Sequence, residues 1–449
     1  MARRDIILHP LANRLLVALL CIAPCACARY APDPLSVSAT PAGPAFVREY
    51  GASSAATLAI DLSAPLDDRA IASLAVMANP DLKALRVRTR VSDAQVFAAG
   101  LMPDPTISLG VDHLLSGADP VDALTSALGL DLNALRTRGA VVAKAQAERR
   151  QARTDLVWAE WQTAGQARLQ AVRIDALERK VRLTDASQMS TEKLLARYVA
   201  ATRRGDVAAD ALQTARIAAS DAGDVARQAQ KDLAAARLEL NRLLGLPPQT
   251  MLTIAPATPF NGMPDADGLF ALASTERADL RALRDGYDAQ EAALRKAVLD
   301  QFPSLDLTVN AGRDTGKNVT LGPAIGFTLP LWNRNRGGVA VETATRAALK
   351  AEYEARLFQT RAEIAAAISG LKVARAQFGA QQAGLDGATR FAAKSRKAAT
   401  RGDLSDAAAQ TAEQVARDRQ MQSTQSAQDM AEQMIALELL TGMPREQWK

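Results

Sequence analysis

The sequence contains little cysteine, histidine or aromatic residue. Its 449 residues include three cysteines, all at positions 21, 25 and 27, only two histidines, His9 and His113, and 4% aromatic residues. Without a later cysteine, the chain has no disulfide framework and no thiolate nucleophile. The acidic residues are scattered along helical segments and form no compact cluster with a histidine. These absences argue against an enzyme, and we expect no cofactor and no metal site.

A strong charge excess is also missing. The 54 basic and 49 acidic residues leave a formal charge of +5, and no dense basic run follows the first residues. Proteins that bind nucleic acid concentrate positive charge on one face, so we expect no nucleic-acid partner. The hydrophobic share is 48%, much of it alanine, which favours helices packed in thin layers.

Long hydrophobic runs are absent too. The longest near the N-terminus, residues 15–23, follows Arg14. Nine residues at about 1.5 Å each cannot cross a hydrocarbon layer of about 30 Å, so residues 1–26 are predicted to be an export signal peptide. Cys27, preceded by Ala26, is the candidate for lipid attachment after cleavage. Cleavage near Ala28 without lipid is the alternative, and residues 27–75 are predicted to be an extended segment.

Two long stretches lack proline, the main helix breaker. None of the 20 prolines lies at 121–246 or 331–443, and both stretches are rich in helix-forming residues. Each is interrupted once by a similar sequence, at 203–206 and at 400–403. There an arginine suits the end of one helix, a glycine can adopt the left-handed conformation, and an aspartate can cap the next helix. Each stretch is therefore predicted to be a helical hairpin with a turn at its tip.

These features occur twice. Asp81 recurs as Asp279 (279 − 81 = 198), Gly205 as Gly402 and Gly245 as Gly442 (both 197 apart). A period this long exceeds that of solenoid repeats, so each copy is a whole supersecondary block. We predict a first repeat at 76–249, a linker at 250–274, a second repeat at 275–445 and a tail at 446–449.

Before each helical hairpin, apolar residues alternate with polar or small ones. The period of two predicts strands at about 106–112, 127–133, 304–312 and 321–331. A half-buried sheet of a soluble protein would alternate in the same way. If the strands enter a membrane, four are too few to close a barrel, because about eight is the minimum. Three chains would supply 3 × 4 = 12 strands around a water-filled interior.

The motifs that carry a family resemblance are residues 79–82, 101–105, 302–307 and 329–337. With the duplicated hairpins, they resemble the TolC-like outer-membrane efflux channel family over about residues 79–444. The last motif resembles the heavy-metal efflux branch, in which a polar turn leads from a strand into the second long helix. The residues of that strand-to-helix turn are Pro330, Asn333, Arg334, Asn335 and Gly337.

The resemblance implies a mainly α fold with a small β part: a homotrimer whose 12-stranded outer-membrane β-barrel continues into a periplasmic α-helical barrel. It also implies an exit duct that contacts outer-membrane lipid, a periplasmic adaptor (membrane fusion) protein and an inner-membrane pump, typically proton-driven. Metal cations or small toxic compounds are the implied cargo. The periplasmic gate and adaptor contact would lie at Arg203, Arg204, Gly205, Asp206, Arg401, Gly402 and Asp403.

Other functions remain open. A helical periplasmic lipoprotein acting as a scaffold or adaptor would also have long alanine-rich helices, but it would not need four strands of alternating polarity. A duct for protein secretion or for organic drugs would share every feature described above. The sequence does not distinguish these cargoes.

Overall fold

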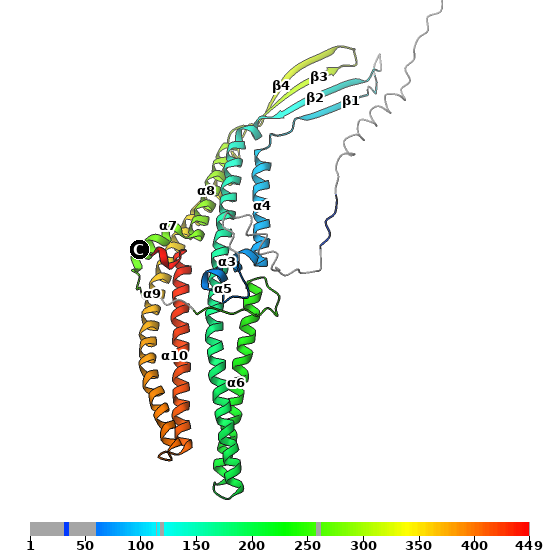
Figure 1. Cartoon of the computed structure of the whole chain (residues 1–449). Coiled ribbons are helices and arrows are strands. Elements are labelled where there is room, and N and C mark those ends of the chain that lie inside the picture. Colours follow the sequence, from blue (N-terminus) through cyan, green and yellow to red (C-terminus); the bar gives the residue numbers. More distant parts are fainter. Residues whose placement is uncertain (1–30, 36–59, 114, 117–120, 257–261, 449) are drawn as a thin grey trace, which may run out of the picture. The chain divides into compact units, whose positions relative to one another are not determined.

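The computed structural model describes residues 31–35, 60–113, 115–116, 121–256 and 262–448. Contacts divide the chain into two units, Met1–Pro41 and Ala42–Lys449. Residues 31–35, the described part of the first unit, adopt no helix or strand. The expected signal peptide and Cys27 lie outside the described residues. All the elements below belong to the second unit (Figure 1).

The second unit contains two copies of one series of elements. The first copy consists of α3 (Asp68–Ala78), α4 (Pro80–Gly100), β1 (Thr106–Asp112), β2 (Ala123–Asp131), α5 (Leu132–Arg203) and α6 (Ala209–Leu243). The second consists of α7 (Ala266–Glu276), α8 (Ala278–Leu299), β3 (Leu305–Arg313), β4 (Val319–Phe327), α9 (Arg336–Thr400) and α10 (Asp406–Thr441), followed by the short 3-10 helix η2 (Arg445–Gln447). The prediction of a mainly helical, duplicated fold is confirmed.

Both copies start earlier than the sequence boundaries of 76 and 275. Asp67 accepts a hydrogen bond from the Ala70 amide and begins α3, and Asp265 accepts one from the Gly268 amide and begins α7. The caps are 198 residues apart (265 − 67). Part of the expected extended segment and part of the expected linker are therefore helical. Short helices with few periodic positions gave no clear signal, although an aspartate before each start is a recognisable cap.

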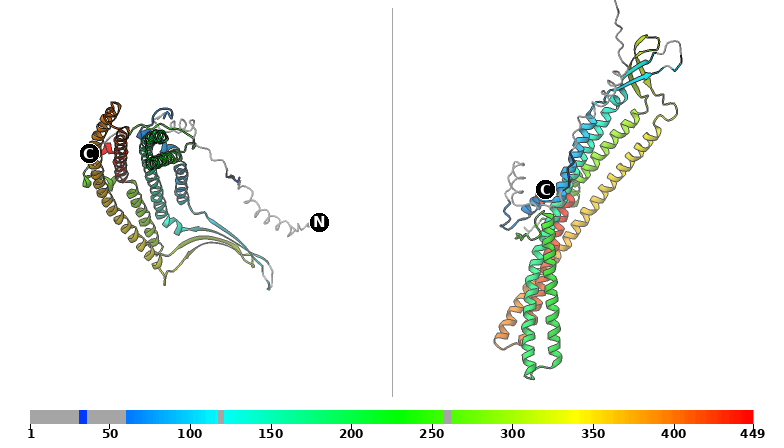
Figure 2. Two further views of the ribbon diagram at one scale, coloured as in Figure 1. Left: turned by 90° about the horizontal axis from the view of Figure 1, so that it is seen from below. Right: turned by 90° about the vertical axis from the view of Figure 1, so that its right-hand side faces the viewer.

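The four strands form one antiparallel sheet in the order β1-β2-β3-β4 (Figure 2). Pairing places Ile107 opposite Leu128, Leu128 opposite Val309, and Val309 opposite Pro323. Residues directly opposite share a face. The alternation therefore produces one mainly apolar face, which also carries Ser126 and Arg313, and one face of threonine, serine, glycine, alanine, asparagine and aspartate. β1 and β4 are the two edges of this sheet.

The second and fourth strands differ from the prediction at both ends, and they begin earlier than expected, at Ala123 and Val319. The second strand was expected at 127–133 but ends at Asp131, whose carboxylate accepts a hydrogen bond from the Ala134 amide and starts α5. Leu132 and Asn133 are therefore helical. The fourth strand was expected at 321–331 but ends at Phe327, before the segment that contains Pro330. In both cases, alternating apolar residues continued past the point where the backbone changes conformation.

Helix α5 is the central element, with 72 residues (Figure 1). It packs against α4 and α6 of its own copy and against α8 and α10 of the second copy. Helix α9, the equivalent helix of the second copy, packs against α7, α8 and α10. Small apolar side chains of α5, such as Ala167 and Ala171, are buried at these contacts, which lets the helices approach closely. Helix α5 is thus surrounded by helices of both copies, whereas the helices packed against α9 belong to its own copy.

The repeated sequence motifs meet at a corner in each copy. The Asn79 side chain donates a hydrogen bond of 2.9 Å to the carbonyl of Leu243, at the end of α6. Arg277 donates one of 3.0 Å to the carbonyl of Leu440, at the end of α10. Donors are 198 residues apart (277 − 79) and acceptors 197 (440 − 243). In the first copy, therefore, the joint between α3 and α4 anchors the last turn of α6. In the second copy, the joint between α7 and α8 anchors the last turn of α10.

Candidate functional site

The two helix tips share one backbone geometry. Gly205 and Gly402 have φ of +83° and +84°, the left-handed conformation that glycine adopts without strain. The amide of Asp206 donates to the carbonyl of Ala201 at 3.0 Å, closing the end of α5. The equivalent bond at the second tip joins Asp403 to Ala398 at 2.9 Å. The sequence therefore identified the turns and the residues that reverse the chain.

The charged residues of the tips pair within their own turns. Arg204 binds Asp206 at 2.8 Å, and Arg401 binds Asp403 at 3.0 Å, with all four side chains exposed. Neither aspartate caps the following helix, which corrects the expectation from the sequence. Ser405 caps α10 instead, whereas α6 begins without a side-chain cap. An aspartate two residues after an arginine is close enough to bind it, and this pairing prevails. The remaining tip residue, Arg203, is exposed.

Behind the tips, polar contacts join the two hairpins. Arg197 of α5 binds Asp406 of α10 at 2.7 Å, and Gln410 donates to the Ser190 hydroxyl at 2.8 Å. One turn further from the tip, the Ser187 hydroxyl donates to Gln414 at 2.8 Å. These residues were not predicted from the sequence. Their spacing of three and seven residues on α5 and of four residues on α10 was the available signal, because it places them on one face of each helix.

A second group of charges joins α9 to α10 near the tip. Arg396 binds Glu413 at 2.5 Å and Asp406 at 3.5 Å. The hydrogen bond from Arg396 holds the pKa of Glu413 below its usual range. Asp406 is therefore shared between Arg396 of its own hairpin and Arg197 of the other. A cavity of about 620 Å³ lies alongside, lined by residues of α5, α6 and α10.

The sheet carries the second candidate surface. On its apolar face, the large side chains of Ile107, Leu109, Leu321 and Ile325 are all exposed. The opposite face has small residues, Asn310 and acidic residues along the paired strands, with Asp131 directly opposite Asp306. His113 follows the first strand and binds Asp122 at 2.5 Å across the hairpin end. Within the described residues, no group of three or more His, Cys, Asp or Glu side chains is placed to hold a metal ion.

The strand-to-helix turn predicted at Pro330, Asn333, Arg334, Asn335 and Gly337 connects β4 to α9. Arg334 and Asn335 have φ of +47° and +46°, which non-glycine residues rarely adopt. The Asn335 side-chain amide donates to the carbonyl of Ala297, near the end of α8, at 2.8 Å. This contact ties the turn to the neighbouring helix. The structure thus places all five residues in one segment.

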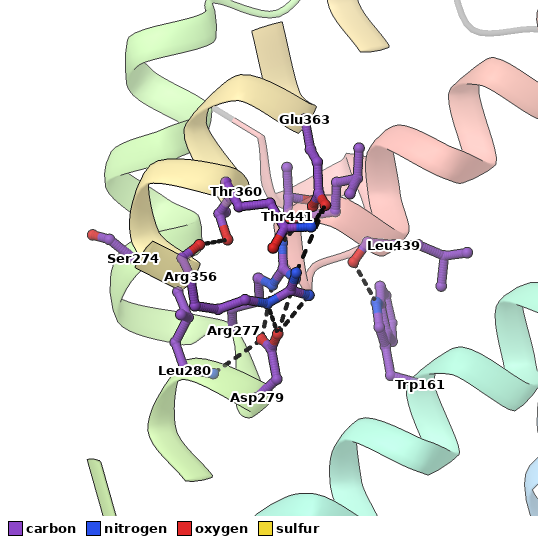
Figure 3. A network of polar contacts seen from close by, with 12 residues as sticks. Trp161, Ser274, Arg277, Asp279, Leu280, Arg356, Thr360, Glu363, Leu439 and Thr441 are labelled. Carbon is purple, nitrogen blue, oxygen red and sulfur yellow. Dashed lines mark hydrogen bonds and ion pairs between the residues drawn. The ribbon is translucent and has the colours of Figure 1, made fainter. Parts of the chain in front are cut away.

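Figure 3 shows the polar network at the corner of the second copy. Arg277 is 1% exposed and binds Asp279 at 2.8 Å, while its guanidinium lies 5.0 Å from the centre of the Trp158 ring of α5. Arg356 of α9 binds the same carboxylate at 3.0 Å. The network was not predicted, although Asp279 was recognised as a repeated position. It connects the second copy to the central helix of the first.

Comparison with known proteins identifies the fold. Residues 269–443 match the model of the outer membrane efflux protein family. This match covers most of the second copy but less than half of the chain. No curated protein matches the chain significantly. Among the described residues, we find no helix long and apolar enough to cross a membrane.

Solved structures match far more of the chain. One is the transmembrane channel CusC, with a TM-score of 0.68 and 16% identity over 84% of this chain and 92% of that one. Another is the outer membrane protein VceC of Vibrio cholerae, with a TM-score of 0.67 and 17% identity over 84% and 96%. The outer membrane channel CmeC of Campylobacter jejuni gives 0.70 and 15% over 84% and 85%. The chain has the fold of these outer-membrane channels.

Proposed function

We propose that the chain is one subunit of a trimeric outer-membrane duct that serves an efflux pump. The observation that carries this proposal is a four-stranded sheet with an exposed apolar face and two open edges. In a bilayer, unpaired backbone groups at such edges each cost several kcal/mol, so the sheet must close. Three chains would give a closed wall of 12 strands, with the small polar residues facing water.

The internal repeat supports assembly from several copies. Within the chain, α8 of the second copy packs against α5 of the first. Helix α4 is the equivalent of α8, and the equivalent of α5 is α9. The symmetric contact would therefore join α9 of one chain to α4 of the next. Both helices expose large apolar residues, including Phe97 of α4 and Phe358 of α9. A ring of chains would cover them.

Because the chain contains an internal repeat, the family match at 269–443 also supports an efflux role for the first copy. A shift of 197 residues carries these bounds to 72 and 246, which lie in the first copy. Both copies have the same elements in the same order, so we extend the outer membrane efflux protein family to the whole chain. Lipid attachment at Cys27, a location in the outer membrane with most of the chain in the periplasm, a periplasmic adaptor and a proton-driven inner-membrane pump belong to this proposal. Metal cations or small toxic compounds are the proposed cargo, and the resemblance of residues 329–337 favours metal cations.

The test is the oligomeric state of the mature chain extracted from outer membranes in detergent. A trimer in mass measurement and negative-stain images, together with conductance in planar bilayers, is the expected result. A soluble monomer without conductance would favour the periplasmic scaffold. Cargo is tested separately, by comparing the sensitivity of cells to metal salts and to organic drugs when the gene is deleted. Sensitivity to organic drugs alone would contradict the metal cargo.

We further propose that the tips form the periplasmic gate and the adaptor contact. Because Arg204 and Arg401 pair within their own turns, the contacts nearest the tips that join the two hairpins of one chain include those of Arg197 with Asp406 and of Ser190 with Gln410. Loss of the Arg197 contact in Arg197→Gln should raise the resting conductance of the bilayer-inserted trimer. The double variant R204S/R401S tests the tip residues themselves, as contacts between copies. Unchanged conductance in both variants would refute the gate.

A further inference from the structure

The two copies differ most where a strand leads into a long helix. In the first copy, β2 ends at Asp131 and α5 begins at the next residue. In the second, residues 328–335, here called the β4–α9 linker, separate the two elements. The linker exposes Leu329, Leu331 and Trp332, the last at 87% of its surface. Exposed apolar area of this size is unfavourable in water and marks a surface that contacts another phase or molecule.

Hydrogen bonds at both ends of the β4–α9 linker hold its apolar side chains in their exposed positions. The Thr328 amide donates to the carbonyl of Ser304 at 3.3 Å, and the two hydroxyl groups lie 3.0 Å apart. At its other end, Asn335 is bound to the end of α8. The left-handed backbone of Arg334 and Asn335 persists only where surrounding contacts hold it. The linker is therefore fixed to the fold at both ends while its middle projects.

The linker continues the apolar face of the sheet. The Ser304–Thr328 contact extends the pairing of β3 with β4 by one step on the polar face. Leu329 then follows Phe327 with the period of two that defines the apolar face. The connections that lead into β1 and β3 at the same end of the sheet also expose apolar residues, Met102 before β1 and Phe302 before β3. Exposed apolar residues thus surround the junction of strands and helices.

The chemistry of the linker fits the boundary of a bilayer. Tryptophan prefers the headgroup level, because its ring is apolar and its N–H group is polar. Arginine can extend its head to lipid phosphate while its stem lies against apolar groups. Neither the Arg334 nor the Arg336 side chain has an ion-pair or hydrogen-bond partner within the described parts of the chain. A soluble partner would not require an apolar segment continuous with the lipid-facing side of the sheet.

We propose that the β4–α9 linker is a membrane-interface anchor that contacts phospholipids of the periplasmic leaflet. Leu329 and Leu331 lie among the acyl chains, Trp332 lies at the headgroup level, and Arg334 binds lipid phosphate. Three copies of the anchor would fix the depth of the barrel in the membrane. This proposal rests on the proposed function, because it takes the apolar face of the sheet to be the face that meets lipid.

The test uses tryptophan fluorescence in the reconstituted full-length channel. Replacing Trp158, Trp161 and Trp448 with phenylalanine leaves Trp332 as the only indole. The variant is inserted into phosphatidylethanolamine/phosphatidylglycerol vesicles that carry bromine either near the headgroup or near the end of the acyl chain. We expect bromine near the headgroup to quench Trp332 roughly twofold more strongly, as a residue at the interface requires.

Conductance of the same vesicles separates the two proposals. A conducting channel whose Trp332 is quenched by aqueous iodide but not by brominated lipid would overturn the anchor and leave the duct intact. Protection from both quenchers would overturn it as well, because a neighbouring subunit would then cover the linker. Absence of insertion and conductance would refute the proposed function itself.

Arg334 has its own control. In vesicles with an increasing share of phosphatidylglycerol, headgroup quenching should rise when Arg334 is present, and this dependence should be lost in Arg334→Gln. Arg313→Gln, at the opposite end of the sheet, should keep it. Equal dependence on phosphatidylglycerol in both variants would show that Arg334 does not bind lipid phosphate. Leu331→Ser should lower quenching in every lipid mixture, and unchanged quenching would contradict the inserted position.

Discussion

The two corners perform the same task with different chemistry. At the first, neutral Asn79 binds the Leu243 carbonyl and also accepts a hydrogen bond from the Leu82 amide, capping α4. At the second, Arg277 binds the Leu440 carbonyl, and α8 begins without a side-chain cap. The backbone arrangement is preserved while a neutral group is replaced by a charged one. Both corners pack near α5, but α5 belongs to the same copy as the first corner and to the other copy for the second corner.

A second pair of equivalent residues shows the same change. Asn241 of α6 donates to the carbonyls of Pro248 and Thr250, within its own copy. Its equivalent in α10, Glu438 (438 − 197 = 241), is 1% exposed and binds Arg168 of α5 at 2.6 Å. Neutral residues thus serve the first corner, whereas charged residues of the second corner contact α5 of the first copy, Arg277 over the Trp158 ring and Glu438 through its ion pair with Arg168. Buried ion pairs add little net stability, but each partner is costly to remove alone.

The largest effect that follows is at Arg277. Replacing Arg277 with alanine should lower the free energy of unfolding by about 3–5 kcal/mol, because Asp279 loses a buried partner and the Leu440 carbonyl loses its donor. Asn79→Ala should cost about 2 kcal/mol, for one cap and one carbonyl. Chemical unfolding in detergent measures both. Equal losses would remove the distinction between the corners. Arg361→Ala, which breaks an exposed pair, should cost less than about 1 kcal/mol.

Alanine substitutions of the glycines beside the two corners should also lower the free energy of unfolding by different amounts. Gly245 and Gly442 both have positive φ, which costs a non-glycine residue about 1–2 kcal/mol. A methyl group at Gly245 would also collide with the carbonyl oxygen of Ala78, whereas at Gly442 its closest neighbour is Arg277 Cα at 3.1 Å. Gly245→Ala should therefore cost about 3 kcal/mol in all, more than Gly442→Ala.

Gly402→Ala is the control for backbone strain alone. It lies in open space at a tip and should cost only the 1–2 kcal/mol of a left-handed residue. Unfolding midpoints of the three variants give the order. The same loss for Gly245→Ala and Gly402→Ala would show that the corner tolerates the extra methyl group and is less tightly packed than its geometry indicates.

The sequence predicted those parts of the fold that depend on local rules. Proline-free stretches predicted the long helices, and Gly205 and Gly402 predicted the turns at the tips. The alternation of apolar with polar or small residues predicted the two faces of the sheet. The sequence missed the short helices α3 and α7, because eleven residues contain too few periodic positions to be recognised. It also did not predict α4 and α8, which lie outside the two long proline-free stretches. Contacts between distant elements, such as Arg197 with Asp406 or Arg277 with Trp158, depend on which helix faces meet. No local pattern specifies that choice.

The smallest effect is the pH dependence of the second corner. Burial raises the pKa of Asp279, but hydrogen bonds from Arg277 and Arg356 outweigh it and leave that pKa below its ordinary value. The carboxylate therefore contributes stability above its unfolded-state pKa of about 3.9, and this contribution is lost as the pH falls through the lower folded-state pKa. Asp279→Asn should lower the unfolding midpoint at neutral pH, and the difference from the unmodified chain should narrow below about pH 4.

Asp81→Asn is the matched control in the first copy, since Asp81 occupies the equivalent position (279 − 81 = 198). Its carboxylate is 81% exposed and lies 3.8 Å from Arg242, a distance at which a solvated pair contributes little. We expect its unfolding midpoint to match that of the unmodified chain at every pH. The prediction fails if the midpoint of Asp81→Asn differs from that of the unmodified chain and this difference also narrows as the pH falls. It fails as well if the difference for Asp279→Asn stays constant with pH, because the charge at the second corner would then not be what distinguishes the two copies.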